Sequence, residues 1–122
     1  MSDYAVTVNL SDHNLDDRWW GIAQIGPVLV NTIQPSNALT RVVCTFKRNG
    51  LYPFVFDSDA GADGTITIND AATWDAMIPD DQDFVTFAGD WDWYMQFYEA
   101  TKTYPLTLYK GVLTVHPKKV SA

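Results

Sequence analysis

The run Trp91–Tyr98 constrains the fold more than any other part of this sequence. Large apolar side chains occupy every second position in it, namely Trp91, Trp93, Met95 and Phe97. Successive side chains of a β-strand point to opposite faces, so these four share one face of a predicted strand. A second run, rich in β-branched and aromatic residues, covers Leu106–Val115, and a short polar segment joins the two. This pattern predicts a β-hairpin at the centre of the fold.

Earlier segments alternate in the same way. Tyr4–Leu10 is a predicted first strand, with Tyr4, Val6, Val8 and Leu10 on one face. Leu39–Arg48 is another, with Val42, Cys44 and Phe46 on its apolar face. Asn49-Gly50 follows it directly and precedes Leu51–Phe56. Asn-Gly between two alternating runs predicts a hairpin with a type I′ turn, because both central residues of that turn need positive φ.

The composition favours strands and loops over helices. The chain has fifteen acidic residues, and all of them except Glu99 are Asp, which favours turns where Glu favours helices. One short helix remains possible, capped by Asn69-Asp70 and running through Met77. The sequence therefore predicts an all-β, antiparallel β-sandwich of seven or eight strands with at most one short helix. We expect residues 1–117 to form this single domain and residues 118–122 to form a short C-terminal tail.

The predicted core follows from the inward faces of these strands. We expect six side chains to be largely buried, namely Val42, Phe46, Ile66, Trp93, Met95 and Leu113. Cys44 is the only cysteine, so it has no partner for an intramolecular disulfide. Its place in an apolar strand predicts a buried thiol rather than a nucleophile.

The sequence contains no arrangement that predicts catalysis. The loop 57–63 resembles a calcium-binding loop at first, but Gly61 and Ile68 stand where that motif requires oxygen ligands. His13 and His116 are far apart in the chain, and no nucleophile motif accompanies either of them. Neither the P-loop nor the dinucleotide-binding glycine pattern is present. We expect a protein that is not an enzyme and that has no metal or cofactor.

Charge and hydropathy limit the partners. The formal net charge of −7 opposes sequence-independent binding to nucleic acid. No apolar run approaches the roughly 20 residues of a membrane-spanning helix, so we expect no membrane partner. The first residues have neither the basic region nor the apolar region of a signal peptide. The expectation is a protein made in a cytoplasm.

The segment Arg18-Trp19-Trp20 is the strongest candidate for an interaction site. Neighbouring residues of an extended chain face opposite ways, so one Trp enters the core and the other points outward. The outward Trp is either a lid on the core or an anchor in a protein interface, where Trp and Arg are enriched. Arg18, Trp19 and Trp20 are thus the predicted interface residues.

The C-terminal part of the chain resembles a group of small tailed-bacteriophage proteins. The motifs that carry the resemblance are Thr65–Ile68, Ala72–Trp74, Ile78-Pro79, Ala88–Trp93 and Thr107–Val115. The resemblance implies an immunoglobulin-like β-sandwich similar to the N-terminal domain of phage baseplate upper proteins. The chain departs from the group at Tyr94, where an Asp is common, and at Pro117-Lys118-Lys119, which replaces an Asp-Val-Thr. Members of the group are virion components, and none of their functional residues carries over to this chain.

The resemblance leads to the expected function. We expect a non-enzymatic virion protein of the tail, baseplate or fibre attachment, which assembles with other virion proteins and with copies of itself and binds no sugar. One alternative is a capsid decoration protein. Another is a carbohydrate-binding module that stacks sugars on exposed aromatic side chains, with Trp19, Trp20 or Tyr109 as the candidates.

Overall fold

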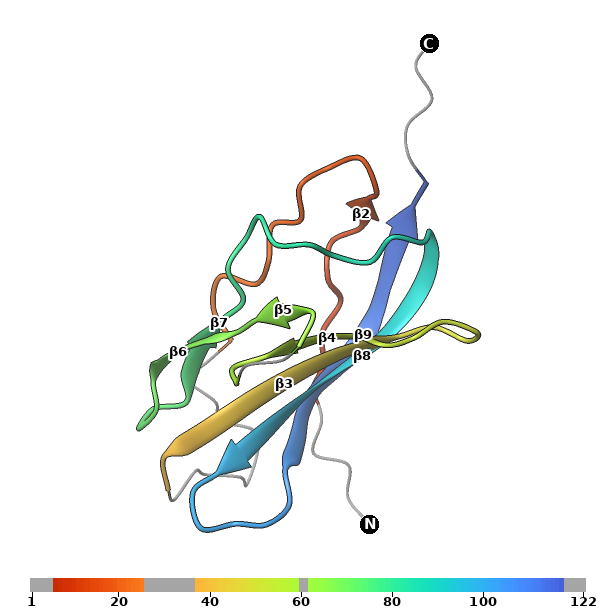
Figure 1. Cartoon of the computed structure of the whole chain (residues 1–122). Coiled ribbons are helices and arrows are strands. Elements are labelled where there is room, and N and C mark those ends of the chain that lie inside the picture. Colours follow the sequence, from red (N-terminus) through yellow and green to blue (C-terminus); the bar gives the residue numbers. More distant parts are fainter. Residues whose placement is uncertain (1–5, 26–36, 60–61, 118–122) are drawn as a thin grey trace.

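The structure, a computed structural model, describes residues 6–25, 37–59 and 62–117 (Figure 1). In these residues all regular elements are strands and none is a helix, which confirms the predicted all-β class. The predicted tail 118–122 lies outside the described residues. The strands are β1 (Val6–Thr7), β2 (His13–Asn14), β3 (Leu39–Lys47), β4 (Phe54–Asp57), β5 (Gly64–Thr65), β6 (Thr67–Asp70), β7 (Asp75–Met77), β8 (Gly89–Glu99) and β9 (Leu106–His116).

The main sheet is built around the predicted hairpin. Strands β8 and β9 pair antiparallel, with Trp91 opposite Leu113, and β3 pairs antiparallel with the other side of β8. The strand order is β1-β9-β8-β3-β4-β5, and β2 also pairs with β9. Strands β1 and β2 run parallel to β9, and β5 runs parallel to β4. The sheet is therefore mixed, and the expectation of a purely antiparallel sandwich is wrong at its edges.

A smaller layer covers one face of the main sheet. It consists of the antiparallel pair β6–β7 and an extended segment beside β7, in which the Ile22 N–H donates to the Ile78 carbonyl at 3.0 Å. Strands β5 and β6 are almost continuous, and Ile66 stands between them. The chain passes from one layer to the other at Ile66, and Figure 1 shows β6 and β7 displaced to one side of the long strands.

The core lies between the two layers. The alternating residues of β8 all point into it, and all six side chains predicted to be core are buried. The buried apolar residues form one continuous cluster rich in aromatic rings, including Phe46 and Phe56 from neighbouring strands. Each such side chain contributes about 1.5–3 kcal/mol by leaving water. The opposite face of β8 carries Asp90, Asp92, Tyr94 and Gln96, which are exposed or half-buried.

The connection between β3 and β4 is longer than the sequence predicts. The last pair of the two strands is Phe46 with Phe54, so seven residues connect them. Only Gly50 in this loop has positive φ, at 81°, and the Leu51 N–H donates to the Arg48 carbonyl at 3.1 Å. Positive φ at the third turn residue alone indicates a type II turn. The antiparallel pairing predicted for the two runs is confirmed, but the predicted type I′ turn is wrong, because the loop continues through Pro53 before pairing begins.

The short helix predicted for residues 69–77 is also wrong. Asn69 and Asp70 end β6, and β7 begins at Asp75. The Asp70 carboxylate accepts a hydrogen bond from the Ala72 N–H. The side chain that was expected to cap a helix therefore stabilises the turn between β6 and β7. Trp74 has φ 59°, which no helix allows. Its indole is fully buried and stacks on Phe97, which holds the backbone in that conformation.

The predicted first strand ends earlier than expected. Among the described residues, β1 covers Val6 and Thr7 and stops before Leu10, and the predicted start at Tyr4 lies outside those residues. Val8 and Leu10 pack against the core as expected, whereas Val6 is exposed. The N-terminal segment therefore follows the edge of the sheet beside β9 and contributes little to its pairing.

Candidate functional site

The segment Arg18-Trp19-Trp20 places its two indoles on opposite sides of the chain, as predicted. Trp19 is 7% exposed, and its ring stacks on Phe84 with the centroids 4.0 Å apart. Its carbonyl accepts a hydrogen bond from the Asp81 N–H at 3.1 Å, which ties the segment to the loop before β8. Trp20 is 75% exposed. Of the three predicted interface residues, Trp19 is therefore part of the core, and Arg18 and Trp20 remain accessible.

Arg18 supports the exposed indole. Its guanidinium carbon lies 4.7 Å from the centroid of the Trp20 ring. A guanidinium over an aromatic face at this distance is attracted by about 0.5–1 kcal/mol at an exposed site. The same guanidinium lies 3.7 Å from the Asp80 carboxylate, and both side chains are about half exposed. This ion pair adds little stability in water, and together the two contacts favour the orientation of Trp20 seen in the structure.

Two hollows flank this segment. One, of about 390 Å³, is lined by Asp17, Arg18, Asp81 and Asp83 above the buried rings of His13 and Phe84. The other, of about 320 Å³, lies between the Asn9–His13 segment and Trp20. Burial lowers the pKa of His13, and the carboxylates of Asp17 and Asp16 oppose that shift. The surface therefore offers the exposed Trp20 ring beside one hollow, and the second hollow lies next to Arg18.

The structure leaves only one of the three aromatics considered for sugar stacking. Trp19 is buried, and the Tyr109 hydroxyl donates to the Ile25 carbonyl at 3.0 Å while its ring packs against Phe97. Burial raises the pKa of Tyr109, in keeping with this inward position. Of these three candidates, only Trp20 presents a flat ring to solvent.

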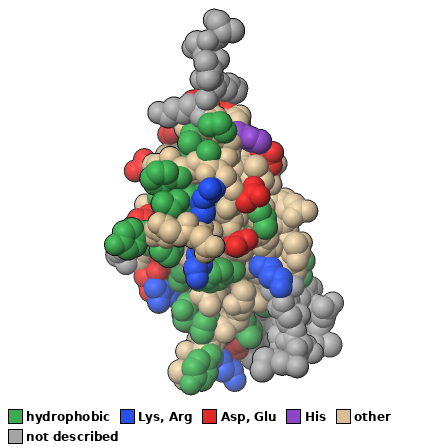
Figure 2. All heavy atoms as spheres, turned by 90° about the vertical axis from the view of Figure 1, so that its right-hand side faces the viewer, with side chains coloured by type: hydrophobic (Ala, Val, Ile, Leu, Met, Phe, Trp, Pro, Cys, Tyr) green, Lys and Arg blue, Asp and Glu red, His purple; other side chains and the backbone are tan. Residues whose placement is uncertain are grey.

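A further concave surface, which the sequence did not predict, lies on the outward face of the main sheet, where β3 ends and β8 begins. The Lys47–Pro53 loop and the first half of β8 form a groove of about 880 Å³, and we call it the loop groove. It is lined by Lys47, Arg48, Asn49, Leu51, Pro53, Gly89, Asp90, Asp92 and Tyr94. Figure 2 views the molecule from the side toward which this loop extends, and basic and acidic side chains are intermixed there.

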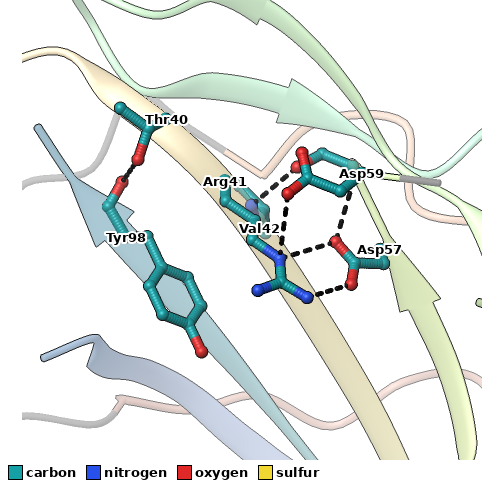
Figure 3. A network of polar contacts seen from close by, with 7 residues as sticks. Thr40, Arg41, Val42, Asp57, Asp59 and Tyr98 are labelled. Carbon is teal, nitrogen blue, oxygen red and sulfur yellow. Dashed lines mark hydrogen bonds and ion pairs between the residues drawn. The ribbon is translucent and has the colours of Figure 1, made fainter. Parts of the chain in front are cut away.

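The polar cluster on β3 and β4 serves the fold (Figure 3). Arg41 donates two hydrogen bonds to the carboxylate of Asp57, the first from Nε at 3.0 Å. It also lies 3.4 Å from Asp59 and over the Tyr98 ring. The hydrogen bonds from Arg41 lower the pKa of Asp57, whose side chain is buried. Because its charges are paired within the sheet, we infer that this cluster stabilises the pairing of β3 with β4 and does not bind a ligand.

Three reactive side chains remain from the sequence analysis, namely Cys44, His13 and His116. Cys44 is fully buried, as predicted, and burial raises the pKa of its thiol. Strands β2 and β9 bring His13 and His116 to one end of the sheet, where His116 contacts Asp12 at 2.8 Å. Within the described ranges, no group of three or more His, Cys, Asp or Glu side chains is placed to hold a metal ion.

Comparisons with known proteins give no family assignment. No protein-family model matches the chain, and no curated protein matches it. A search of the described elements finds no helix that could cross a membrane. The functional argument therefore rests on the sequence and the geometry of this chain.

Proposed function

We propose that this chain is a non-enzymatic structural protein of a tailed-phage virion, located at the tail, the baseplate or the fibre attachment. It is made in the host cytoplasm and acts by assembling with other virion proteins and with copies of itself. We further propose that its two β-layers are an immunoglobulin-like sandwich. The strand motifs of residues 65–115 support this assignment, because their apolar positions are the core positions of the two layers.

The observation that supports an assembly role most strongly is the exposure of Trp20. Its indole is 75% exposed although the adjacent Trp19 is buried. Exposing a large apolar ring to water gives the isolated protein no stability, and Trp is enriched among the residues that dominate protein interfaces. Arg18, the other residue type enriched there, fixes the orientation of the ring. Arg18 and Trp20 are thus already arranged for binding in the isolated chain.

The shape of the surrounding surface suits such a contact. An interface of standard size buries about 800 Å² on each partner, and its anchors stand near the centre within a rim that excludes water. Trp20 lines the hollow of about 320 Å³, Arg18 lines the hollow of about 390 Å³, and a partner's side chains can fill both. Arg18 and Asp80 belong to the polar rim.

The test replaces Trp20 by Ala and measures association of the purified chain with itself and with the other virion proteins by analytical ultracentrifugation. The proposal predicts at least a tenfold loss of association with an unchanged melting temperature. Tyr104→Ala is the matched control, because Tyr104 is also a large exposed aromatic, at 83%, but lies in the β8–β9 turn. Equal association of the Trp20→Ala protein and the wild type would contradict the proposed surface.

A further inference from the structure

The loop groove contains polar side chains that the fold does not use. Within the part of the chain that the structure describes, no hydrogen bond or ion pair engages the side chains of Lys47, Asn49 or Asp92, which all line the groove. Together they offer an ammonium donor, an amide that both donates and accepts, and a carboxylate acceptor. Tyr94 adds a half-buried ring and a hydroxyl. Polar groups that converge in a concavity can fix the orientation of a small ligand and give specificity for it.

Internal contacts hold the walls of the groove in place. The Arg48 guanidinium donates to the Ala88 carbonyl at 2.6 Å and lies across Gly89. Gly89 has φ 127°, a conformation that residues with a side chain rarely adopt, and a Cβ there would also have to displace the end of the Arg48 side chain. The Asp90 carboxylate accepts a hydrogen bond from the Thr114 hydroxyl at 2.9 Å. The loop side and the strand side are thus fastened, and a ligand would find the groove already formed.

We propose that the loop groove binds a neutral saccharide of a few rings. Each sugar hydroxyl both donates and accepts a hydrogen bond, so it matches a site whose free groups include a donor, an acceptor and an amide. The apolar face of a sugar ring can pack on Tyr94, with Leu51 and Pro53 on the loop side. This inference goes beyond the proposed assembly role, and it departs from the sequence-based expectation that no sugar binds.

The charges in the groove disfavour the other classes of small ligand. Asp90 and Asp92 repel phosphates and other anions, while Lys47 and Arg48 repel cations. Its lining is too polar for an apolar ligand, which would leave the free charged groups desolvated and unpaired. A peptide that extends a sheet needs a free strand edge, and β8 is already paired with β3 and β9 on its two sides.

The experiment screens the full chain against a printed panel of neutral, sialylated and sulfated oligosaccharides of two to four rings. The best neutral oligosaccharide is then titrated into ¹⁵N-labelled protein. We expect binding to a neutral member and chemical-shift changes confined to residues 47–53 and 89–94. Asp92→Asn and Asn49→Ala should each weaken this binding by about tenfold, the effect of losing one hydrogen bond of about 1.4 kcal/mol to the ligand.

The matched controls keep the same chemistry outside the groove. Asp83→Asn and Tyr104→Ala change an exposed carboxylate and an exposed aromatic elsewhere, and they should leave saccharide binding unchanged. The wild-type shift map still tests the site if a groove variant fails to fold. No binding to any neutral saccharide, shifts outside the groove, or groove-dependent binding only to anionic sugars or to peptides would overturn the proposal.

Discussion

The indole of Trp19 stacks on the ring of Phe84, with the planes 8° from parallel and the centroids 4.0 Å apart. Trp20, the next residue, points the other way and lies under the guanidinium of Arg18. Trp19 therefore packs in the core, and Trp20 of the same segment is exposed to solvent. The proposed assembly surface depends on the buried Trp19, because a side chain already held near its bound position loses less conformational entropy on binding.

The two adjacent Trp residues should respond differently to truncation. Trp19→Ala removes a buried ring from an aromatic cluster and should cost about 3–5 kcal/mol of unfolding free energy. Trp20→Ala removes an exposed ring and should change that free energy by no more than about 0.5 kcal/mol. Urea denaturation monitored by circular dichroism measures both values. Similar losses for the two variants would mean that Trp20 also belongs to the core.

Truncation of Trp93 tests the assignment of the inward face of β8. The side chain is 3% exposed and packs near Phe46 across the β3–β8 pair. Trp93→Ala should destabilise the fold by about 3–5 kcal/mol, a large part of the stability of a domain of this size. Thermal melting compares it with Tyr104→Ala, whose side chain is exposed. A Trp93→Ala protein that melts with the wild type would show that the opposite face of β8 is the buried one.

Gly50 should be needed for its backbone conformation and for nothing else. Its φ is 81°, and a Cβ placed there meets no atom within 4 Å. Gly50→Val should therefore cost about 1–2 kcal/mol through strain alone. Gly50→Asn should cost less, because Asn tolerates positive φ at this position of a type II turn. Chemical denaturation separates the two, and equal midpoints for Val and Asn would rule out a positive φ at residue 50.

The Arg41–Asp57 pair makes a pH-dependent contribution to stability. The hydrogen bonds from Arg41 lower the pKa of Asp57 in the folded state below its unfolded value, which is about 3.9. The contribution is thus complete above about pH 4 and is lost as the pH falls through the lowered pKa, while Arg41 stays charged. Asp57→Asn should flatten the dependence of unfolding free energy on pH below about 4. Asp92→Asn, at an exposed site, is the control and should keep the wild-type slope.

Local patterns predicted the centre of this fold correctly. The alternation from Trp91 to Phe97 identified both the hairpin partner strand and the buried face, because one face of β8 meets the core and the other meets solvent. The same argument placed Trp19 and Trp20 on opposite sides. These predictions needed only the period of a strand, which is a local property.

The wrong predictions concern residues whose conformation depends on pairing with distant parts of the chain. Asp70 resembles a helix cap, but β6 and β7 pair across the turn that it stabilises. The parallel partners of β9 come from the far end of the chain, and no local pattern records such a pairing. The loop groove exists because Lys47 of β3 pairs with Asp92 of β8, which brings the Asn49 loop beside β8. When strand pairing brings residues together from distant parts of the chain, no spacing in the sequence predicts that they will be neighbours.

The central claim is that this chain is an assembled part of a tailed-phage particle. The most direct test is quantitative mass spectrometry of purified virions of the phage that encodes it, combined with chemical cross-linking. The account predicts several copies of the chain in each particle and cross-links to other virion proteins from residues around Trp20. A chain that is abundant in infected cells and absent from purified virions would contradict the account.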